Sequence, residues 1–199
     1  MKTTGLILLA AGASTRLGEP KQLLMYEGES LLQRAIRTAR ASACQPVVVV
    51  LGANAEALLP DVSDLHVVQN PEWEEGMASS IRSGVAALLA LSPAVSGVVL
   101  MVCDQPFADS DLLEKLVAEK NLTGKGIIAS AYSNTLGTPV LFTRPYFQTL
   151  LALRGKEGAK KLILTHAHDV ATVPFPQGII DVDTSEDYEL LQQQQEDER

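Results

Sequence analysis

The stretch that decides the fold is Leu6-Ile7-Leu8-Leu9-Ala10-Ala11-Gly12-Ala13-Ser14-Thr15-Arg16-Leu17-Gly18-Glu19-Pro20-Lys21. Its unbroken apolar run, Leu6 to Ala11, predicts a buried strand, because a strand covered on both faces is apolar at every position. The glycines that follow let the backbone turn tightly and approach a ligand closely. Exposed N–H groups of such a loop bind phosphate oxygens, and Arg16 and Lys21 would neutralise their charge. The stretch therefore predicts a strand that leads into a phosphate-binding loop.

Neither of two familiar phosphate loops fits this stretch. A Walker A loop has G-x-x-x-x-G-K-[ST], but here the second glycine is one residue late and Glu19 follows it. A dinucleotide fingerprint has G-x-G-x-x-G, and Ala13-Ser14 breaks that spacing. Two other interpretations are an ordinary strand-to-helix turn with surface cations and a signal peptide after Lys2. We favour the strand over a signal peptide because the apolar run is short and no clear cleavage site follows it.

The composition indicates a single domain over residues 1–191, followed by a polar tail over 192–199. The chain has 199 residues, 46% of them hydrophobic and 20% charged, which is ordinary for a globular protein. No apolar stretch approaches the ~18 residues of a membrane span, so we expect no membrane partner. Two cysteines at no metal-ligand spacing favour a reducing cytoplasm. The net charge of −8 argues against broad nucleic-acid binding.

Strand-like and helix-like segments alternate along most of the chain. In the first half we expect strands over 5–11, 47–51, 65–69 and 97–102, and helices over 30–42, 78–91 and from about 109. In the second half, segments 126–131 and 138–142 flank a polar connection and predict an antiparallel excursion. Helices near 145–153 and 157–167, short strands over 170–173 and 179–182, and a capping box over 184–187 follow. The pattern predicts a three-layer α/β fold with a mostly parallel sheet, whose ligands sit at the carboxyl ends of the strands.

Asp104 follows the apolar strand over 97–102, and Pro106 ends that strand. A carboxylate at the end of a strand is placed to hold a hard cation such as Mg²⁺, together with substrate phosphates. The alternative is that Asp104 caps the next helix. Because Asp109 and Ser110 already supply that cap, we favour the metal.

Asp181 and Asp183 offer a second carboxylate near the predicted last strand, and alternation places both on one of its faces. Either would complete a metal site opposite Asp104, or both simply precede a capped helix in solvent. Of the two we prefer Asp183.

The segment from Asn70 to Gly84 enters a helix through small and hydroxyl residues and carries the only tryptophan of the chain, Trp73. Free N–H groups and hydroxyls at that entry, including those of Ser79 and Ser80, are suited to a heterocyclic base. The alternative, that the two serines only cap the helix and Trp73 is core, stays open. By contrast, we expect His166 and His168 at the solvated surface and Cys103 as a buried strand cysteine rather than a nucleophile.

These segments together resemble the MobA-like nucleotidyltransferases, and most closely the molybdenum cofactor cytidylyltransferases. The resemblance covers nearly the whole chain through five motifs in the order of the family. They are Leu9-Ala10-Ala11-Gly12-Ala13-Ser14-Thr15-Arg16-Leu17-Gly18 with Pro20-Lys21, Glu75-Gly76-Met77-Ala78-Ser79-Ser80-Ile81-Arg82-Ser83-Gly84, Cys103-Asp104-Gln105-Pro106, Gly137-Thr138-Pro139-Val140-Leu141-Phe142 and Asp181-Val182-Asp183-Thr184-Ser185-Glu186-Asp187.

The resemblance implies a Rossmann-like domain that binds a nucleoside triphosphate and Mg²⁺. It implies catalytic roles for Arg16, Lys21 and Asp104, and a metal held by Asp104 with Asp183, Asp181 being less favoured. It implies a nucleotide site made of Ala10, Ala11, Gly12, Ala13, Arg16, Lys21, Met77, Ser80 and Asp104. Ala11 is typical of the cytidylyl branch, because the guanylyl branch has a second glycine there.

Two positions depart from the pattern of the family. Lys156 stands where the motif Leu-x-Gly-Asp-x-Gly-Ala-Arg of the family has its aspartate, which puts the acceptor contact in question, and Leu17 replaces the usual methionine.

The resemblance implies transfer of CMP from CTP to the terminal phosphate of a molybdopterin acceptor, with a molybdenum hydroxylase as a recipient. The alternatives are a guanylyltransferase, a sugar- or polyol-phosphate nucleotidyltransferase, a non-catalytic nucleotide-binding maturation factor, and a nicotinamide-dependent oxidoreductase, which the failed glycine fingerprint disfavours.

Overall fold

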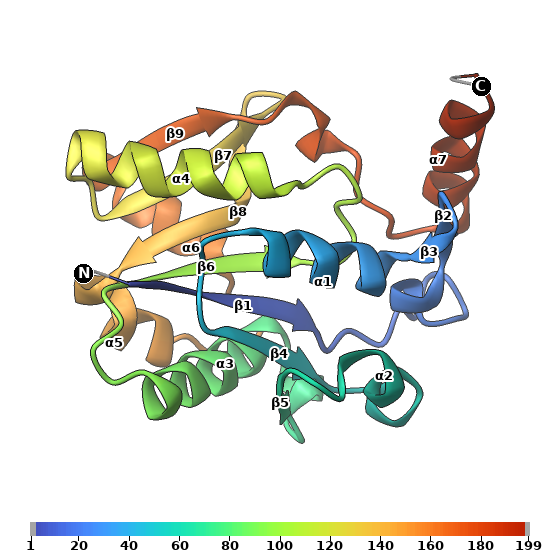
Figure 1. The fold of residues 1–199 in the computed structure, drawn as a ribbon, viewed down its shortest axis with the longest axis horizontal. Coiled ribbons are helices and arrows are strands. Elements are labelled where there is room, and N and C mark those ends of the chain that lie inside the picture. The colour runs from blue at the N-terminus through green and yellow to red at the C-terminus, as the bar shows by residue number, and fades with distance from the viewer. Residues whose placement is uncertain (1–2, 198–199) are drawn as a thin grey trace.

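A seven-stranded sheet forms the centre of the molecule, in the order β5-β4-β1-β6-β8-β7-β9 (Figure 1). The computed structural model describes residues 3–197. The strands are β1 (Thr4–Ala10), β4 (Val47–Leu51), β5 (His66–Gln69), β6 (Gly97–Val102), β7 (Ile127–Tyr132), β8 (Thr135–Thr143) and β9 (Val170–Pro174). A separate hairpin contains β2 (Met25–Tyr26) and β3 (Glu29–Ser30).

The sheet is parallel except around β8. Strands β5, β4, β1 and β6 pair in parallel, whereas β8 is antiparallel to both β6 and β7, and β9 is parallel to β7. The predicted antiparallel excursion is therefore confirmed. In the parallel part, Leu9 of β1 is level with Val50 of β4 and Val102 of β6. That register brings the loops after β1 and β6 to the same edge of the sheet.

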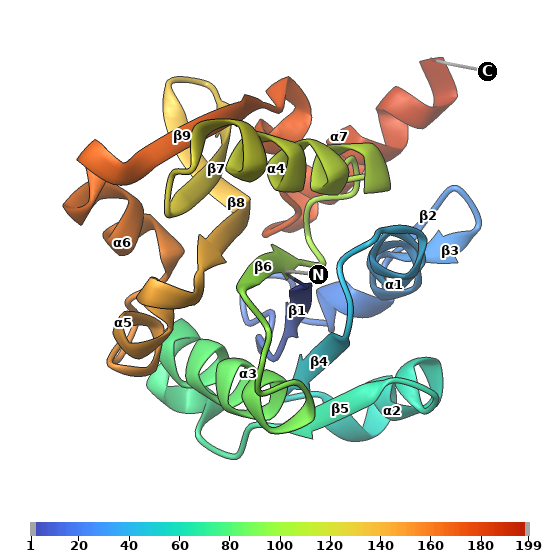
Figure 2. The same cartoon turned by 60° about the vertical axis from the view of Figure 1, so that its left-hand side comes forward.

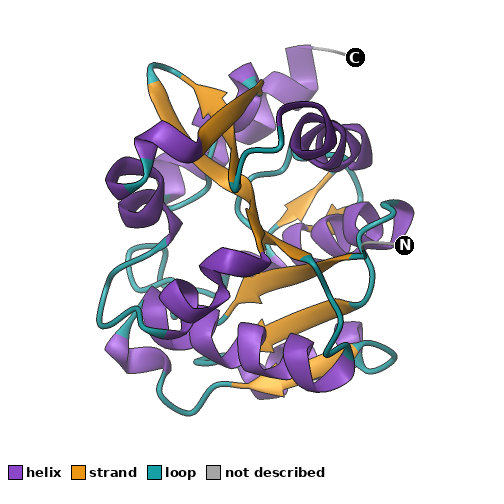
Figure 3. Cartoon of the chain, turned by 90° about the vertical axis from the view of Figure 1, so that its left-hand side faces the viewer, coloured by secondary structure: helices purple, strands orange, loops and turns teal. Residues whose placement is uncertain are grey.

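Helices cover both faces of the sheet, as the three-layer prediction requires (Figures 2 and 3). One core packs β1 against α1 (Leu31–Ala41), α2 (Ala55–Val62) and α4 (Ser110–Thr123). The other core packs β1 against α3 (Met77–Leu91), α5 (Phe147–Leu151) and α6 (Ala159–Thr165). Every residue of β1 is buried, because its alternate side chains enter the two different cores. The hydrophobic run at the start of the chain is thus the central strand.

Two predictions near the C-terminus are wrong. Residues 179–182 form no strand; a 3₁₀ turn covers Pro176–Ile179, where proline has no N–H to donate to a ladder. Instead, the N–H of Val182 donates to the carbonyl of Asp104 at 3.0 Å, which draws this segment towards the end of β6. Residues 192–197 are not a frayed tail but the end of α7 (Ser185–Asp197), consistent with the helix propensity of glutamine.

Several local predictions are confirmed. Thr184 and Asp187 form the predicted box: the N–H of Asp187 donates to Thr184 Oγ1, and the N–H of Thr184 to Asp187 Oδ2. Asp109 caps α4 by accepting from the N–H of Leu112 at 2.8 Å. Helix α2 and the β2-β3 hairpin were not predicted. No helix among residues 3–197 has the length and apolar character needed to cross a bilayer.

Candidate active site

A cavity of about 290 Å³ lies at the carboxyl ends of β1 and β6. Its walls come from the loop after β1, from the entry into α3 and from the residues after β6. The lining residues are Leu9, Ala10, Ala11, Gly12, Ala13, Lys21, Gln22, Trp73, Glu74, Gly76, Met77, Ser80, Val102, Cys103 and Asp104. The structure thus brings together every residue predicted for the nucleotide site except Arg16, which lies beside the cavity.

Gln22 stabilises the conformation of the loop after β1. The side-chain amide of this buried residue donates to the carbonyls of Ala10 and Gly12, both at 3.0 Å. Ser14, with a positive φ of 55°, makes the turn and accepts from the N–H of Lys21 at 3.0 Å. Because two carbonyls of the loop are engaged by Gln22, they are drawn away from the space where a ligand phosphate would lie. Sequence reasoning missed Gln22, although its place directly after Lys21 was a usable signal.

Lys21 joins the two predicted metal-binding carboxylates. Its ammonium donates to Asp104 Oδ2 at 2.5 Å and to Asp183 Oδ1 at 2.7 Å. Arg16 donates to the other oxygen of Asp183 at 2.7 Å. The Lys21 and Asp104 side chains are mostly buried, whereas that of Arg16 is 66% exposed. Asp104 and Asp183, which follow Lys21 by 83 and 162 residues in the chain, therefore converge on its ammonium group.

The ionisation of this cluster follows from its contacts. Burial lowers the pKa of Lys21, but the charge and hydrogen bonds of Asp104 and Asp183 outweigh that effect, so the pKa is raised. Burial raises the pKa of Asp183, but Lys21 and Arg16 outweigh it and lower that pKa below its ordinary value. The charged forms of Lys21 and Asp183 are thus both favoured, and the cluster is an ion pair at neutral pH.

The carboxylates suit a hard divalent cation as a pair rather than as a complete cage. Asp104 and Asp183 reach the same nitrogen atom, so their oxygens lie close enough to share one ion. No group of three or more His, Cys, Asp or Glu residues in the described part of the chain is arranged to hold a metal. Mg²⁺ characteristically takes one or two carboxylates and completes its shell with substrate phosphates and water. The pair fits such an ion in combination with phosphate oxygens, at the place that the Lys21 ammonium occupies in this structure.

The side chains of Asp181 and Asp183 have different surroundings. Asp183 contacts Lys21, whereas Asp181 lines a neighbouring cavity. Burial raises the pKa of Asp181, and the negative charges of Asp104 and Asp183 raise it further. The two carboxylates therefore do not act as equivalents, and the contacts favour the preference for Asp183.

The entry into α3 forms the other wall of the cavity. Asn70, buried after β5, donates to Ser79 Oγ at 2.8 Å and to Ser80 Oγ at 3.0 Å. Ser79 in turn donates to the carbonyls of Glu72 and Gly76, so its hydroxyl is used in holding the turn. Ser80 faces the cavity, and its hydroxyl proton is available to a ligand. Neither serine is the N-cap, because α3 begins at Met77 after Gly76.

The sequence left open whether Trp73 is a core residue or part of a base-binding site, and the structure places it at both the core and the cavity wall. It is half-buried, packs against the core that contains α3, and also lines the cavity. Gly52 allows this packing, since a Cβ atom there would lie 2.8 Å from the Cβ atoms of both Ala11 and Trp73. A flat aromatic wall and the Ser80 hydroxyl therefore lie in the same cavity as the loop after β1.

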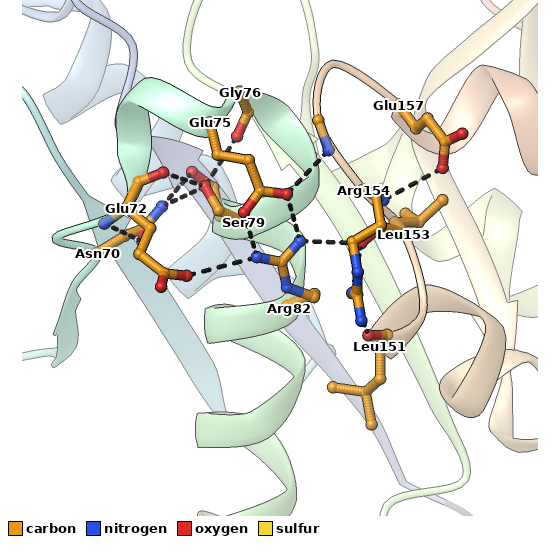
Figure 4. A network of polar contacts seen from close by, with 12 residues as sticks. Asn70, Glu72, Glu75, Gly76, Ser79, Arg82, Leu151, Leu153, Arg154 and Glu157 are labelled. Carbon is orange, nitrogen blue, oxygen red and sulfur yellow. Dashed lines mark hydrogen bonds and ion pairs between the residues drawn. The ribbon is translucent and has the colours of Figure 1, made fainter.

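A second cavity, of about 430 Å³, shares Met77 and Val102 with the first. Its wall includes Asp181, Lys156 and Lys160. The sequence analysis related Lys156 to the acceptor contact, whereas it assigned Lys160 to no site. The loop that carries Lys156 is fastened to the entry of α3, as Figure 4 shows. This arrangement places a second space, with an apolar lining that also carries Lys156, Lys160 and Asp181, directly beside the nucleotide-sized one.

The fastening is an ion pair between Glu75 and Arg82. Arg82 donates to both oxygens of Glu75, at 2.7 and 2.5 Å, and to the carbonyl of Leu153 at 2.8 Å. The N–H of Gly155 donates to Glu75 Oε1 at 2.8 Å. The hydrogen bonds from Arg82 and Gly155 lower the pKa of Glu75 to about 2. Sequence reasoning missed this bridge, because its two sides are about 80 residues apart.

Of the remaining candidates, Cys103 and His168 lie where they were expected, whereas His166 is partly buried rather than at the solvated surface. Cys103 is buried, and burial raises the pKa of its thiol to about 12, so the thiol is protonated and not a nucleophile. His168 is exposed, and His166 packs its ring edge-on against Tyr146 at 5.1 Å between centroids. Neither histidine lines the two cavities described above.

Comparison with known proteins gives a family match over most of the chain. Residues 6–170 match the model of the MobA-like NTP transferase domain. The protein is similar to nicotine blue oxidoreductase of Paenarthrobacter nicotinovorans, with 35% identity over 69% of this chain and 66% of that relative. It is 30% identical to the purine catabolism protein PucB of Bacillus subtilis (strain 168), over 93% and 94% of the two chains. It is 23% identical to the molybdenum cofactor cytidylyltransferase of Escherichia coli (strain K12), over 94% and 95%.

Solved structures agree with these sequence matches. Rv0371c from Mycobacterium tuberculosis H37Rv superposes with a TM-score of 0.79 and 32% identity, over 96% of this chain and 99% of that one. A complex of Rv0371C with manganese has a TM-score of 0.75 and 30% identity, over 96% and 98%. The fold and the predicted family are therefore both confirmed.

Proposed function

The chain belongs to the MobA-like NTP transferase family, and from that premise we propose that it is a cytidylyltransferase. It transfers CMP from CTP to the terminal phosphate of a molybdopterin-type pterin and releases pyrophosphate. The Escherichia coli relative is a molybdenum cofactor cytidylyltransferase, which supports this choice of substrates. The recipient of the product is a molybdenum hydroxylase.

The observation that carries the proposal is the Lys21 ammonium shared by Asp104 and Asp183 at the mouth of the cavity. A cation and two carboxylates beside a small-residue loop are the parts that nucleotidyl transfer needs, since the reaction depends on positioning and charge neutralisation. The cavity then holds the nucleotide with its phosphates at Gly12 and Lys21. Its base lies toward Trp73 and Ser80.

In this arrangement each residue has a defined task. The N–H groups of the loop and the side chains of Lys21 and Arg16 bind the triphosphate and take up the charge that develops on the leaving pyrophosphate. Mg²⁺, held by Asp104 and Asp183, would supply further charge neutralisation between phosphate oxygens. An oxygen of the acceptor phosphate attacks the α-phosphorus in line, and the bond from that phosphorus to the β-phosphate oxygen breaks. No protein nucleophile is needed, and the protonated Cys103 thiol offers none.

A second candidate activity comes from the name of the Paenarthrobacter relative, which is an oxidoreductase. Because the loop lacks the G-x-G-x-x-G spacing that dinucleotides require, we rank this activity below nucleotidyl transfer.

The test is turnover of the purified protein with molybdopterin and Mg²⁺, with CTP, GTP or NADH supplied in parallel. We expect pyrophosphate release with CTP, slower release with GTP and no oxidation of NADH. Asp104→Ala is expected to abolish release, while Asp64→Ala, which removes a surface partner of Arg40, leaves it unchanged. Pyrophosphate release by Asp104→Ala at the wild-type rate, or NADH oxidation without pyrophosphate release, would refute the proposal. Nucleotide binding with no transfer to any acceptor would identify a maturation factor instead.

A further inference from the structure

The second cavity has the size and charge of a binding site, and its position relates it to the first. It measures about 430 Å³ and shares Met77 and Val102 with the nucleotide-sized cavity. Lys156, Lys160, Tyr132 and Asp181 also line it. A molecule in this space would therefore lie beside a nucleotide bound in the first cavity.

Lys156 and Lys160 differ from the other lysine of their segment. Lys161, which follows Lys160, pairs with Glu157. Neither Lys156 nor Lys160 makes an ion pair or a hydrogen bond to any part of the chain that the structure describes, and both side chains are exposed where they line the cavity. Two ammonium groups without carboxylate partners are thus turned to one space.

The backbone beneath Lys156 is fixed although its side chain is free. The N–H of Ala78 donates to the carbonyl of Gly155 at 3.2 Å, and the N–H of Gly155 donates to Glu75, whose ion pair with Arg82 is drawn in Figure 4. Gly76 has a φ of 121°, and a Cβ atom there would lie 2.7 Å from the Gly155 carbonyl oxygen. The loop is therefore held against the entry of α3 at a distance that only glycine allows.

Charge explains why cations are needed at this place. The protein has a net charge of −8, and Asp104, Asp181 and Asp183 gather at the boundary of the two cavities. An acceptor that carries a phosphate would be repelled there unless local cations offset those carboxylates. Lys156 and Lys160 lie on the wall that such an acceptor would contact.

We propose that Lys156 and Lys160 bind an anionic group of the acceptor in the second cavity and so select phosphorylated acceptors. The inference rests on the proposed nucleotidyl transfer and names the part of the site that recognises the second substrate. Asp181, on the same wall, offers carboxylate oxygens to N–H or O–H donors of that molecule. The acceptor class is thus a phosphorylated molecule that also carries hydrogen-bond donors.

The kinetic test uses Lys156→Gln and Lys160→Gln, with Lys161→Gln as the matched control. We expect each of the first two to raise the KM for molybdopterin by about tenfold, the effect of one lost charge-assisted hydrogen bond. The KM for CTP should stay unchanged in all three variants. Transfer with an unchanged molybdopterin KM in both cavity variants would overturn the inference.

A second measurement does not depend on transfer. Lysines are acetylated with acetic anhydride in the presence and absence of inorganic phosphate, and each site is quantified by mass spectrometry. We expect phosphate to protect Lys156 and Lys160 but not Lys115, an exposed lysine on α4. If no acceptor is turned over, the proposed function fails while this protection still supports the anion site. If phosphate changes the acetylation of neither Lys156 nor Lys160, the proposed anion site is overturned.

Discussion

Replacing Lys21 by methionine should abolish transfer and, at the same time, strengthen the binding of a divalent cation in the absence of nucleotide. The ammonium of Lys21 occupies the point where Asp104 and Asp183 converge, with bonds of 2.5 and 2.7 Å. A metal ion must compete with it for the same oxygens. Methionine keeps the volume of the side chain but removes the charge. The two effects therefore point in opposite directions, which a general loss of structure would not produce.

The magnitude follows from the geometry. The two carboxylate oxygens are separated by no more than the sum of the two bonds to Lys21. At about 5 Å and an effective dielectric constant of about 20, two unit charges repel by about 3 kcal/mol. Relief of that repulsion by a bound cation corresponds to at most about 100-fold tighter binding. Because the Asp183 side chain is 33% exposed, we expect about 10-fold, since solvent screens part of the repulsion. Transfer should fall by at least about 100-fold, as when a charge-stabilising donor is removed.

The assay is calorimetric titration of the nucleotide-free protein with Mn²⁺, followed by the rate of pyrophosphate release. Lys115→Met is the matched control, because it removes one positive charge from an exposed position on α4, away from the Lys21 cluster. We expect the control to bind Mn²⁺ and turn over as the wild type does. Mn²⁺ affinity of Lys21→Met equal to or below that of the control would refute competition between the ammonium and the metal.

Three further predictions concern the walls of the two cavities. Ala11→Gly should shift the ratio of kcat/KM for CTP and GTP toward GTP by about tenfold, the effect of one methyl group in a pocket; an unchanged ratio would show that Ala11 does not select the base. Asp181→Asn should stabilise the protein against urea at pH 7, because the raised pKa of Asp181 means that the fold disfavours its ionised form. This gain in stability should vanish as the pH falls below the pKa of the unfolded carboxyl, about 3.9. A gain that persists at low pH would contradict the raised pKa of Asp181 as its cause. Arg82→Gln should raise the KM for the acceptor more than that for CTP, with partial rescue by Arg82→Lys, because Arg82 positions the Lys156 loop through Glu75 and Leu153; equal changes in both KM values would indicate a merely structural role.

Local sequence patterns were sufficient for the framework of the site. The apolar run that ends at Ala11 predicts a strand buried on both faces, and the small residues after it predict a loop. Strand β6 delivers Asp104 to the same edge because parallel neighbours end together. These features depend on residues close in sequence, so their periodicity and turn chemistry predict them.

The errors lie where long-range contacts outweigh local pattern. Residues 179–182 have the apolar character of a strand, but the bond from Val182 to the Asp104 carbonyl holds them as an irregular segment. The polar residues after 191 suggested a tail, yet they continue α7. In both places the sequence pattern was compatible with two structures.

The sequence by itself therefore determined the α/β fold, and it predicted the loop after β1 as a phosphate-binding loop with Asp104 facing it. Only the tertiary structure shows that Asp183 reaches Lys21, because this contact joins two residues that are 162 positions apart in the chain. It alone joined Glu75 and Arg82 to the loop of Lys156 and turned two unpaired lysines to the second cavity. The physical reason is that charge pairing across a cleft depends on distances in space, and spacing along the chain does not contain those distances.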